Sequence, residues 1–372
     1  MKNYGKCMVL AFVMIFTLAG CSKVDTMQET RQQTFDEQVD AVVESMTLPE
    51  KVGQLVMIGI HGTELNDDSR YMLNQYHIGG VLLFDRNLQS AEQTTRLTAE
   101  LQGEAQKVPL LIGLDEEGGT VVRGKSFITP PPSAQSLGTA GDNTQAEAWA
   151  RRTGEQLAKL GFNVNFAPVA DVGDSSRDFS RDPQVVKKFV AAAAQGYESA
   201  HMIYTLKHFP GIGKGQVDSH IDRSNIIATK QQLAEEDLLP FKEIISQHDT
   251  EDFMVLMSHL IYPEIDASNP ASLSPEIQTK LLRQEMGFNG VIITDDLEMG
   301  AVSKYGDFRQ LGVQAVLAGA DIVLVCHEYP HETDVYLGLL EAAEKGTISQ
   351  ERLNESVKRI VRMKLLRGNS PR

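Results

Sequence analysis

The centre of the chain carries the stretch MIYTLKHFPGIGKGQVDSH, which spans residues 202–220. Its first five residues are apolar and rich in β-formers, so they predict a short buried strand. A basic pair, Lys207 and His208, follows where that strand ends, at a place where a hydroxyl-rich ligand could be bound. Several glycines then predict a loop, which ends on Asp218 and His220. A carboxylate next to an imidazole raises the pKa of the imidazole and orients it for proton transfer.

The pattern of a short apolar strand followed by a helix recurs on both sides of this stretch. Eight strands are predicted, at Leu55–Ile60, Gly80–Phe84, Pro109–Leu114, Asn163–Pro168, Met202–Leu206, Phe253–Ser258, Gly290–Thr294 and Asp321–Cys326. Eight helices alternate with them, at Asp67–Gln75, Ala91–Gln106, Gln145–Leu160, Pro183–Ala200, Thr229–Ser246, Ser274–Gln284, Asp307–Ala318 and Thr333–Lys345. The count of eight favours a closed (β/α)8 TIM-type barrel, an α/β fold, over an open doubly wound sheet with the same rhythm. A last amphipathic helix, Glu351–Leu366, is expected to pack under or beside the barrel.

The bulk properties of the chain exclude several classes of function. Its 372 residues suit one such domain. With 35 basic and 50 acidic residues its net charge is −15, which argues against nucleic acid or an anionic membrane surface as its partner. Its three cysteines, Cys7, Cys21 and Cys326, form no disulfide framework. The sequence has neither a phosphate-binding loop nor a Rossmann fingerprint, and no cofactor is expected.

The first residues predict export and a lipid anchor. Residues 1–20 are predicted to be a signal peptide, because a basic start precedes an apolar run that is too short to span a membrane comfortably. The sequence Leu18-Ala19-Gly20-Cys21 resembles a bacterial lipobox, in which the cysteine is diacylated and becomes the mature N-terminus. We therefore expect an extracytoplasmic lipoprotein of the cell envelope, with residues 21–40 as a flexible tether and residues 41–372 as the barrel domain. The alternative is an ordinary secretory signal that has a cysteine by chance.

The loop at residues 207–220 resembles the Lys-His-(Phe/Trp)-Pro-Gly-x-Gly-x(4)-Asp-Ser-His signature of the family 3 glycoside hydrolases, in the β-N-acetylglucosaminidase branch. The resemblance covers roughly residues 40–366, and it implies that His220 is the general acid/base and that Asp218 is its partner. Many relatives carry a second histidine where this chain has Ile212. Because that position is not the acid/base, the difference leaves the assignment of His220 intact. The alternative is a glycine-rich surface loop with incidental histidines.

Two further strand ends carry polar residues that fit the same family. Three consecutive acids, beginning with Asp115, follow the third strand, and Arg123 comes eight positions after Asp115. The resemblance implies that Asp115 accepts hydrogen bonds from sugar hydroxyls and that Arg123 donates to the sugar. For Glu116, a solvated acidic turn remains a reasonable alternative. After the fourth strand, Arg177 is placed on the sugar-binding arginine of the family, with Arg181 as its competitor.

By the same resemblance, the seventh strand supplies the nucleophile. Asp295 directly follows Thr294, and a rigid strand end holds a carboxylate in place for attack on an anomeric carbon. Asp296 is expected to orient the loop, because an acidic turn that caps the next helix fits it better than it fits Asp295. Glu298 departs from the small or polar residue usual in the family, and we expect this departure to be neutral. Asp171, after the fourth strand, is expected to tie its own loop.

Histidines at the other strand ends are expected to be structural. His259 follows the sixth strand, and we expect a core histidine whose ring nitrogens are satisfied. His327 and His331 follow the eighth strand and could suggest a metal site. Because Pro330 interrupts any helix between them and no third ligand is evident, no metal site is expected.

These features together predict a retaining exo-glycosidase that removes terminal, non-reducing β-linked N-acetylglucosamine. Asp295 would attack the anomeric carbon, and the pair of His220 and Asp218 would replace the second carboxylate of the usual scheme. Lys207 and His208 would bind the sugar. Relatives act on GlcNAc–MurNAc fragments, so a cell-surface anchor suggests peptidoglycan as the source of the substrate. Two alternatives stay open: an exo-β-glycosidase of other specificity, and a catalytically silent sugar-binding surface lipoprotein.

Overall fold

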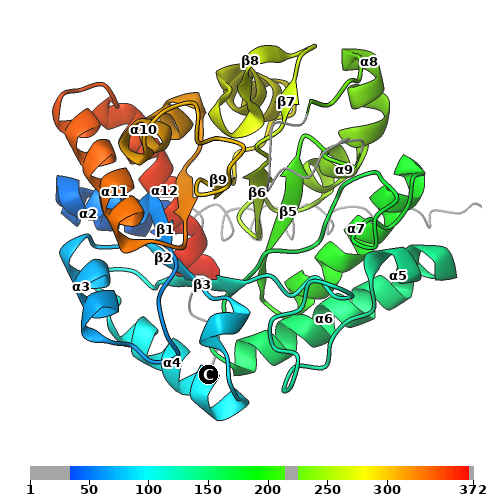
Figure 1. Ribbon diagram of the computed structural model, residues 1–372, viewed down its shortest axis with the longest axis horizontal. Coiled ribbons are helices and arrows are strands. Elements are labelled where there is room, and N and C mark those ends of the chain that lie inside the picture. The colour runs from blue at the N-terminus through cyan, green and yellow to red at the C-terminus, as the bar shows by residue number, and fades with distance from the viewer. Residues whose placement is uncertain (1–33, 214–224, 368–372) are drawn as a thin grey trace, which may run out of the picture.

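Eight parallel strands close into a barrel, which confirms the predicted fold class (Figure 1). The computed structural model describes residues 34–213 and 225–367, so the predicted signal peptide, Cys21, Asp218 and His220 lie outside the described residues. The barrel strands are β1 (Val56–Ile58), β2 (Gly80–Leu82), β3 (Leu111–Leu114), β4 (Val164–Asn165), β5 (Ile203–Phe209), β6 (Phe253–Met257), β9 (Val291–Asp296) and β10 (Ile322–Val325). Strand β1 closes the barrel because it pairs with both β2 and β10.

Helices surround the barrel and connect consecutive strands (Figure 1). The helices that follow the strands in turn are α3 (Asp67–Gln75), α4 (Ala91–Gly103), α6 (Asn143–Lys159), α7 (Pro183–Ser199), α9 (Leu239–Gln247), the π-helical segment η4 (Glu276–Glu285), α10 (Phe308–Ala318) and α11 (Tyr329–Glu344). Helix α2 (Leu48–Gln54) leads into β1, and α12 (Gln350–Arg367) packs against α2 and β9. The sequence analysis missed several short elements: η1 (Asp85–Asn87), α5 (Ala134–Ala140), η3 (Ala271–Leu273), and the hairpin of β7 (Ile261–Tyr262) and β8 (Asp266–Pro270). It also merged α8 (Lys230–Gln232), η2 (Leu233–Asp237) and α9 into one helix.

Several element boundaries differ from the prediction, among them those of β5, β9 and α11. Strand β5 continues to Phe209 because its end still pairs with β6, and β9 continues to Asp296 because its end still pairs with β10. The polar residues expected to follow these strands therefore lie on them, where the sheet fixes their backbone. Helix α11 begins at Tyr329, because Pro330 lies in the first turn, where the missing N–H costs no helical hydrogen bond.

The predicted tether is partly wrong, because residues 34–45 form a helix that packs on the barrel. Val39 and Val43 lie on its buried face, with exposed fractions of 3% and 2%, and Phe35 packs against the same core. Asp36 adds an ion pair with Arg362 of α12. Apolar residues spaced four apart are typical of an amphipathic helix, and they outweigh the polar composition of the segment. Residues 34–40 therefore belong to the folded domain.

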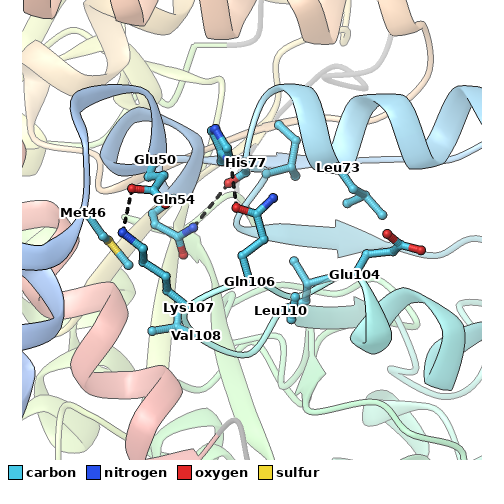
Figure 2. A pocket seen from close by; sticks show the side chains of 12 residues that line it. Met46, Glu50, Gln54, Leu73, His77, Glu104, Gln106, Lys107, Val108 and Leu110 are labelled. Atoms are coloured by element: carbon cyan, nitrogen blue, oxygen red, sulfur yellow. Dashed lines mark hydrogen bonds and ion pairs between the residues drawn. The ribbon is translucent and has the colours of Figure 1, made fainter.

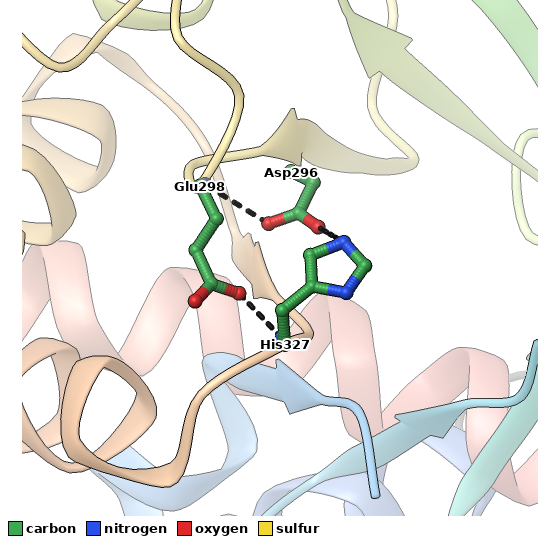
Figure 3. Close-up of side chains that lie close together, drawn as sticks. All are labelled: Asp296, Glu298 and His327. Carbon is green, nitrogen blue, oxygen red and sulfur yellow. Dashed lines mark hydrogen bonds and ion pairs between the residues drawn. The ribbon is translucent and has the colours of Figure 1, made fainter.

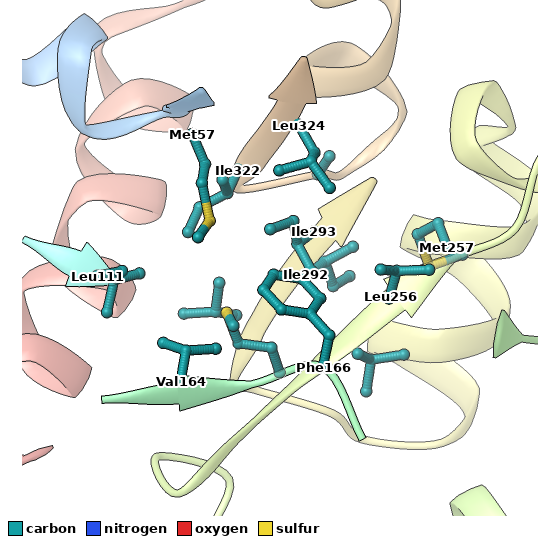
Figure 4. Close-up of a cluster of buried hydrophobic side chains, with 14 of the residues drawn as sticks. Met57, Leu111, Val164, Phe166, Leu256, Met257, Ile292, Ile293, Ile322 and Leu324 are labelled. Carbon is teal, nitrogen blue, oxygen red and sulfur yellow. The ribbon is translucent and has the colours of Figure 1, made fainter. Parts of the chain in front are cut away.

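Apolar side chains fill the inside of the barrel (Figure 4). Met57 of β1, Leu111 of β3, Ile293 of β9 and Leu324 of β10 converge there with Phe166, which follows β4, and all five are at most 2% exposed. A barrel filled in this way is a packed core and offers no pore. Polar groups from the strands can therefore gather only at the two ends of the barrel.

The amino-terminal ends of the strands are closed by polar contacts between connecting segments. Figure 2 shows a pocket of about 20 Å3 at this end, lined in part by Gln54, His77 and Lys107. Lys107 Nζ pairs with Glu50 at 2.8 Å, and His77 Nδ1 lies 2.9 Å from the amide oxygen of Gln106. Such a space holds about one water molecule, so this end of the barrel is structural.

A buried lysine lies at the same end of the barrel. Lys364 of α12 is fully buried, and its ammonium donates to Gln54 Oε1 and to the carbonyl of Gly79, both at 2.6 Å. Both acceptors are neutral, so burial lowers the pKa of Lys364 to about 7.

This lysine should make the stability of the fold depend on pH. Between about pH 7 and 10.5 the unfolded chain binds the lysine proton more tightly than the folded chain, so the free energy of unfolding should rise with pH across that window. The rise from this one group is at most about 1.4 kcal/mol per pH unit. Urea denaturation at pH 7, 8 and 9 gives the free energy of unfolding at each pH. This free energy should rise less steeply with pH in Lys364→Met than in the wild type. Lys358→Met, on the exposed side of the same helix, should keep the wild-type slope. An unchanged slope in Lys364→Met would refute the assignment.

Candidate active site

A cavity of about 260 Å3 lies at the carboxyl ends of the strands, opposite the closed end. Its walls come from the ends of β2, β3, β4, β5, β6, β9 and β10. Of the predicted site residues, Asp115, Arg123, Arg177, Lys207, His208 and Asp295 all line it. A closed parallel barrel brings residues that are far apart in the chain to one place. Lys207 and Asp115, for example, are in contact although they are 92 positions apart.

Lys207 is the centre of a buried charge network. Its side chain is 3% exposed, and its ammonium lies 2.7 Å from Asp115 Oδ1 and 2.5 Å from Glu117 Oε1. Burial on its own would lower the pKa of Lys207, but the charges of Asp115 and Glu117 outweigh it and raise the pKa. Burial would likewise raise the pKa of Asp115, but Lys207 and Arg123 hold it at about 2. The lysine therefore stays a cation and the aspartate stays an acceptor for hydroxyl groups.

Glu117 is a cavity residue that the sequence analysis did not single out. It binds Lys207 and also the guanidinium of Arg177 through two hydrogen bonds of 2.8 Å. Alternate residues of extended chain point to the same side, so the pairing of Asp115 with Glu117 could have been predicted from their spacing of two. Arg177, in contrast to the competitor Arg181, is thereby held in the cavity; the Arg181 side chain is 75% exposed and pairs with Asp174.

The alternative of a solvated turn is wrong for Glu116, which is completely buried. Its Oε2 accepts hydrogen bonds from the backbone N–H groups of Arg123 and Gly124, at 2.8 and 3.2 Å. Burial raises the pKa of this carboxyl above its usual range. Because it binds the backbone of Arg123, Glu116 positions the loop that carries this sugar-binding candidate.

Asp171 ties the loop after β5, although it follows β4. It accepts from the backbone N–H groups of His208 and Ile212, at 3.2 and 2.8 Å, and its Oδ2 lies 2.7 Å from His208 Nδ1. A carboxylate can only accept here, so Nδ1 carries the proton. The other ring nitrogen, Nε2, is then an acceptor for Arg177, 3.3 Å away. Asp171 is therefore structural, as predicted, but the loop that it ties is the one after β5 and not its own.

The two aspartates at the end of β9 have different surroundings. Asp295 lines the cavity, and its Oδ1 accepts from the N–H of Asp296 at 3.0 Å. The Asp296 carboxylate instead binds the N–H of Glu298 at 3.0 Å and His327 Nε2 at 3.1 Å. The carbonyl of Asp296 also accepts from His259 Nε2, and Ser272 contacts the other ring nitrogen of His259, so this histidine is satisfied as expected. Both aspartates line the cavity, but the carboxylate of Asp296 is bound to Glu298 and His327 and so orients the loop.

Glu298 is not a neutral departure, because it fixes the loop after β10 (Figure 3). Its carboxylate accepts from the N–H groups of Cys326 and His327, and its Oε1 lies 2.7 Å from His331 Nδ1. With Asp296 and His327 it also forms a group whose possible ligand atoms lie within 4.8 Å of one another; this group contains one of the two histidines considered in the sequence, His327, and two carboxylates from the end of β9 and the turn after it. The hydrogen bonds just described engage all three side chains of this group. We therefore assign to the group the role of supporting the loop after β10.

The chain is similar to known proteins in both sequence and structure. The family described as "Glycosyl hydrolase family 3 N terminal domain" matches residues 47–363. The chain is 38% identical over 284 residues to "Beta-hexosaminidase" of Stenotrophomonas maltophilia (strain K279a), covering 73% of this chain and 83% of that protein. The chain is also 34% identical over 335 residues to "Beta-hexosaminidase A" of Pseudoalteromonas piscicida. This match covers 81% of this chain but only 56% of that protein. Among solved structures, a glycoside hydrolase family 3 β-N-acetylglucosaminidase from Paenibacillus sp. str. FPU-7 has a TM-score of 0.84 and 38% identity, with 87% of this chain and 63% of that chain covered.

The buried network should contribute measurably to stability. In Glu117→Gln, the buried Lys207 and the half-buried Arg177 lose one neighbouring negative charge, although Lys207 keeps Asp115 as a partner. We expect the free energy of unfolding to fall by about 1–3 kcal/mol, below the cost of breaking an isolated buried pair. Asp174→Asn is the matched control, because its ion pair with Arg181 is exposed and such pairs contribute about 0–1 kcal/mol. Urea denaturation measures both variants, and an equal, small loss in the two would contradict the central role of Glu117.

Proposed function

Because the chain belongs to glycosyl hydrolase family 3, we propose that it is a β-N-acetylhexosaminidase that removes terminal, non-reducing β-linked N-acetylglucosamine. The observation that carries this proposal is a cavity with a dense set of fixed donors and acceptors on one side and the carboxylate of Asp295 on the other. The relatives are named as a β-hexosaminidase and a β-N-acetylglucosaminidase, which supports the choice of a hexosaminide over other sugars.

The charge network provides the binding half of the proposed site. Asp115, ionised because Lys207 and Arg123 lower its pKa, accepts from sugar hydroxyls. Lys207, Arg123 and Arg177 donate to them, and His208, which Asp171 orients, would contact the sugar beside these groups. Since the protein holds these groups in place before the sugar arrives, little reorganisation is needed on binding.

The proposed reaction is a double displacement with retention. One carboxylate oxygen of Asp295 forms a bond to the anomeric carbon from the face opposite the leaving group. The bond from that carbon to the leaving oxygen breaks, and the leaving oxygen takes a proton from the acid. Water then attacks the glycosyl-enzyme, loses its proton to the same group acting as base, and releases Asp295. The N–H of Asp296, which binds Oδ1 of Asp295, would orient the carboxylate for this attack.

We assign the acid/base role to His220 with Asp218 as its partner, on the sequence motif alone. General acid catalysis contributes about 10²–10⁴-fold, and it matters most when the leaving group is poor. Equal losses in His220→Ala for disaccharides and for aryl glycosides with acidic phenols would reject this assignment.

From the sequence we also propose that the substrate comes from peptidoglycan fragments. A second proposal is that a lipid anchor on Cys21 holds the enzyme at the outer surface of the cell membrane. Among the described residues, no helix is long and apolar enough to cross a membrane. Cys21→Ala should prevent lipidation and give a soluble or an uncleaved form, and wild-type protein found unacylated in the cytoplasm would refute the anchor.

A substrate comparison tests the proposed activity. With one aryl leaving group throughout, kcat/KM should be highest for the β-N-acetylglucosaminide. The β-glucoside, which leaves the partners of the acetamido group unpaired, should be at least about tenfold worse. A preference for the glucoside would favour an exo-β-glycosidase of other specificity, and activity on no aryl glycoside would favour the silent sugar-binding lipoprotein.

A trapping experiment tests the nucleophile. A slow, fluorinated N-acetylglucosaminide should accumulate as a covalent adduct, and peptide mass spectrometry should find it on Asp295. Asp295→Ala should remain folded, lose most of its activity and carry no adduct. The neighbouring Asp296 serves as the internal control, because its carboxylate is engaged by His327 and Glu298. An adduct on Asp296 would exchange the roles of the two residues.

A further inference from the structure

The N-terminal helix, residues 34–45, lies under the closed end of the barrel, opposite the cavity. Near its start, Asp36 pairs with Arg362 of α12, and Arg362 also pairs with Glu251, two positions before β6. At its other end, a backbone carbonyl accepts a hydrogen bond of 2.5 Å from Lys107, four positions before β3. The helix therefore crosses beneath the barrel from the start of β6 to the start of β3.

Contacts with α12 fix the place where the chain enters the folded domain. Lys358 of α12 pairs with Asp40 of the N-terminal helix at 2.7 Å. The guanidinium of Arg362 lies 5.1 Å from the centre of the Phe35 ring. Together with the two buried valines described above, these contacts hold Thr34 at the amino-terminal ends of the strands, on the side of the molecule away from the cavity.

The chain between Cys21 and Thr34 is short in comparison with the domain. Thr34 follows Cys21 by 13 positions, so even a fully extended chain separates them by at most about 45 Å. The sequence predicts a flexible tether here, and such a chain of this length typically spans only about 20 Å. A domain of this size is about 50 Å across. With the cavity turned to the membrane, Thr34 would lie beyond the reach of the tether.

The charge of the protein favours the same orientation. Its net charge is −15, so an anionic lipid surface repels the domain. The N-terminal helix itself exposes the acidic residues Glu37 and Glu44. A body that is repelled by the surface to which it is tethered turns its point of attachment toward that surface. Here the point of attachment lies at the amino-terminal ends of the strands.

Given the lipid anchor proposed for Cys21, we propose that the surface formed by the N-terminal helix and α12 faces the membrane, and that the cavity opens away from it. The lipid bilayer is then the partner of this surface through the tether and without direct binding. The enzyme acts on glycan ends that lie about 50 Å or more outside the membrane, which is the width of the domain. A glycan that a lipid of its own holds in the same membrane is out of reach.

Fluorescence quenching measures this orientation. The acylated protein is isolated from membranes, labelled with one dye and inserted into vesicles whose lipids carry the acceptor. Glu44→Cys places the dye on the N-terminal helix, and Thr120→Cys places it in the loop after β3 at the cavity end; both positions are exposed, whereas Cys326 is buried. Quenching should be at least about twofold stronger in Glu44→Cys, because the two dyes differ in height by nearly the width of the domain.

A comparison of two substrates on the same vesicles tests the consequence for activity. One substrate is a soluble aryl β-N-acetylglucosaminide, and the other is a glycolipid with the same terminal sugar, embedded in the vesicle membrane. The wild type should hydrolyse the glycolipid poorly. An insertion of about 30 flexible residues between Cys21 and Thr34 lets the cavity turn to the membrane, so the ratio of glycolipid to soluble rate should rise at least about tenfold. The rate on the soluble substrate should stay unchanged.

Equal quenching at the two positions, or stronger quenching in Thr120→Cys, would overturn the orientation and leave the anchor intact. An unchanged ratio of rates in the lengthened variant would also overturn it. Protein without an acyl group on Cys21 would overturn both the anchor and the orientation. A wild-type enzyme inactive on the soluble substrate would reject the hexosaminidase proposal, and the quenching comparison would still decide the orientation.

Discussion

The organisation of the site depends on one buried ammonium group. Lys207 is almost completely enclosed at the end of β5, where an unpaired charge would be very unfavourable. Asp115 and Glu117 from the β3 end compensate it, and Glu117 in turn holds Arg177, which contacts His208. One cation thus joins the ends of β3 and β5 with the loop after β4. A sugar that enters the cavity therefore meets donors and acceptors whose positions are already set by their mutual charges.

The fold was largely predictable from the sequence because each barrel strand is buried on both faces. Such strands appear as short apolar runs, and their alternation with helices leaves few other architectures. The ends of β5 and β9 were not predictable, because they carry charged residues that only the neighbouring strands keep in the sheet. The segment at residues 34–40 was misjudged for the opposite reason. Its composition is polar, but two valines spaced four apart dock it on the core.

Residues of the candidate site that face the cavity individually could be predicted from the sequence. Residues whose role is to hold other protein groups in place were harder to predict. Asp115, Arg177 and Asp295 were identified individually, and the structure brings all three into one cavity. Glu117 was missed and Glu116 misjudged, because adjacent acids differ only in the side of the chain to which they point, and the sequence alone does not say which side is buried. Glu298 was judged neutral for a similar reason: its partners, Cys326 and His331, follow a different strand and meet it only in the closed barrel.

The two ends of the cavity differ in how their charges are compensated, and this division follows from the chemistry. At the binding end, Asp115 and Glu117 are paired with cations, which lowers their basicity and keeps them as fixed hydrogen-bond acceptors. A nucleophile needs the reverse, because a carboxylate neutralised by an adjacent cation attacks an anomeric carbon less readily. Asp295 is held by the backbone N–H of Asp296, and in the described part of the chain the lysine and arginine side chains that line the cavity pair with the carboxylates of the binding end. Strand β9 thus orients the proposed nucleophile through the main chain, and these lysine and arginine ion pairs lie at the far side of the proposed sugar site.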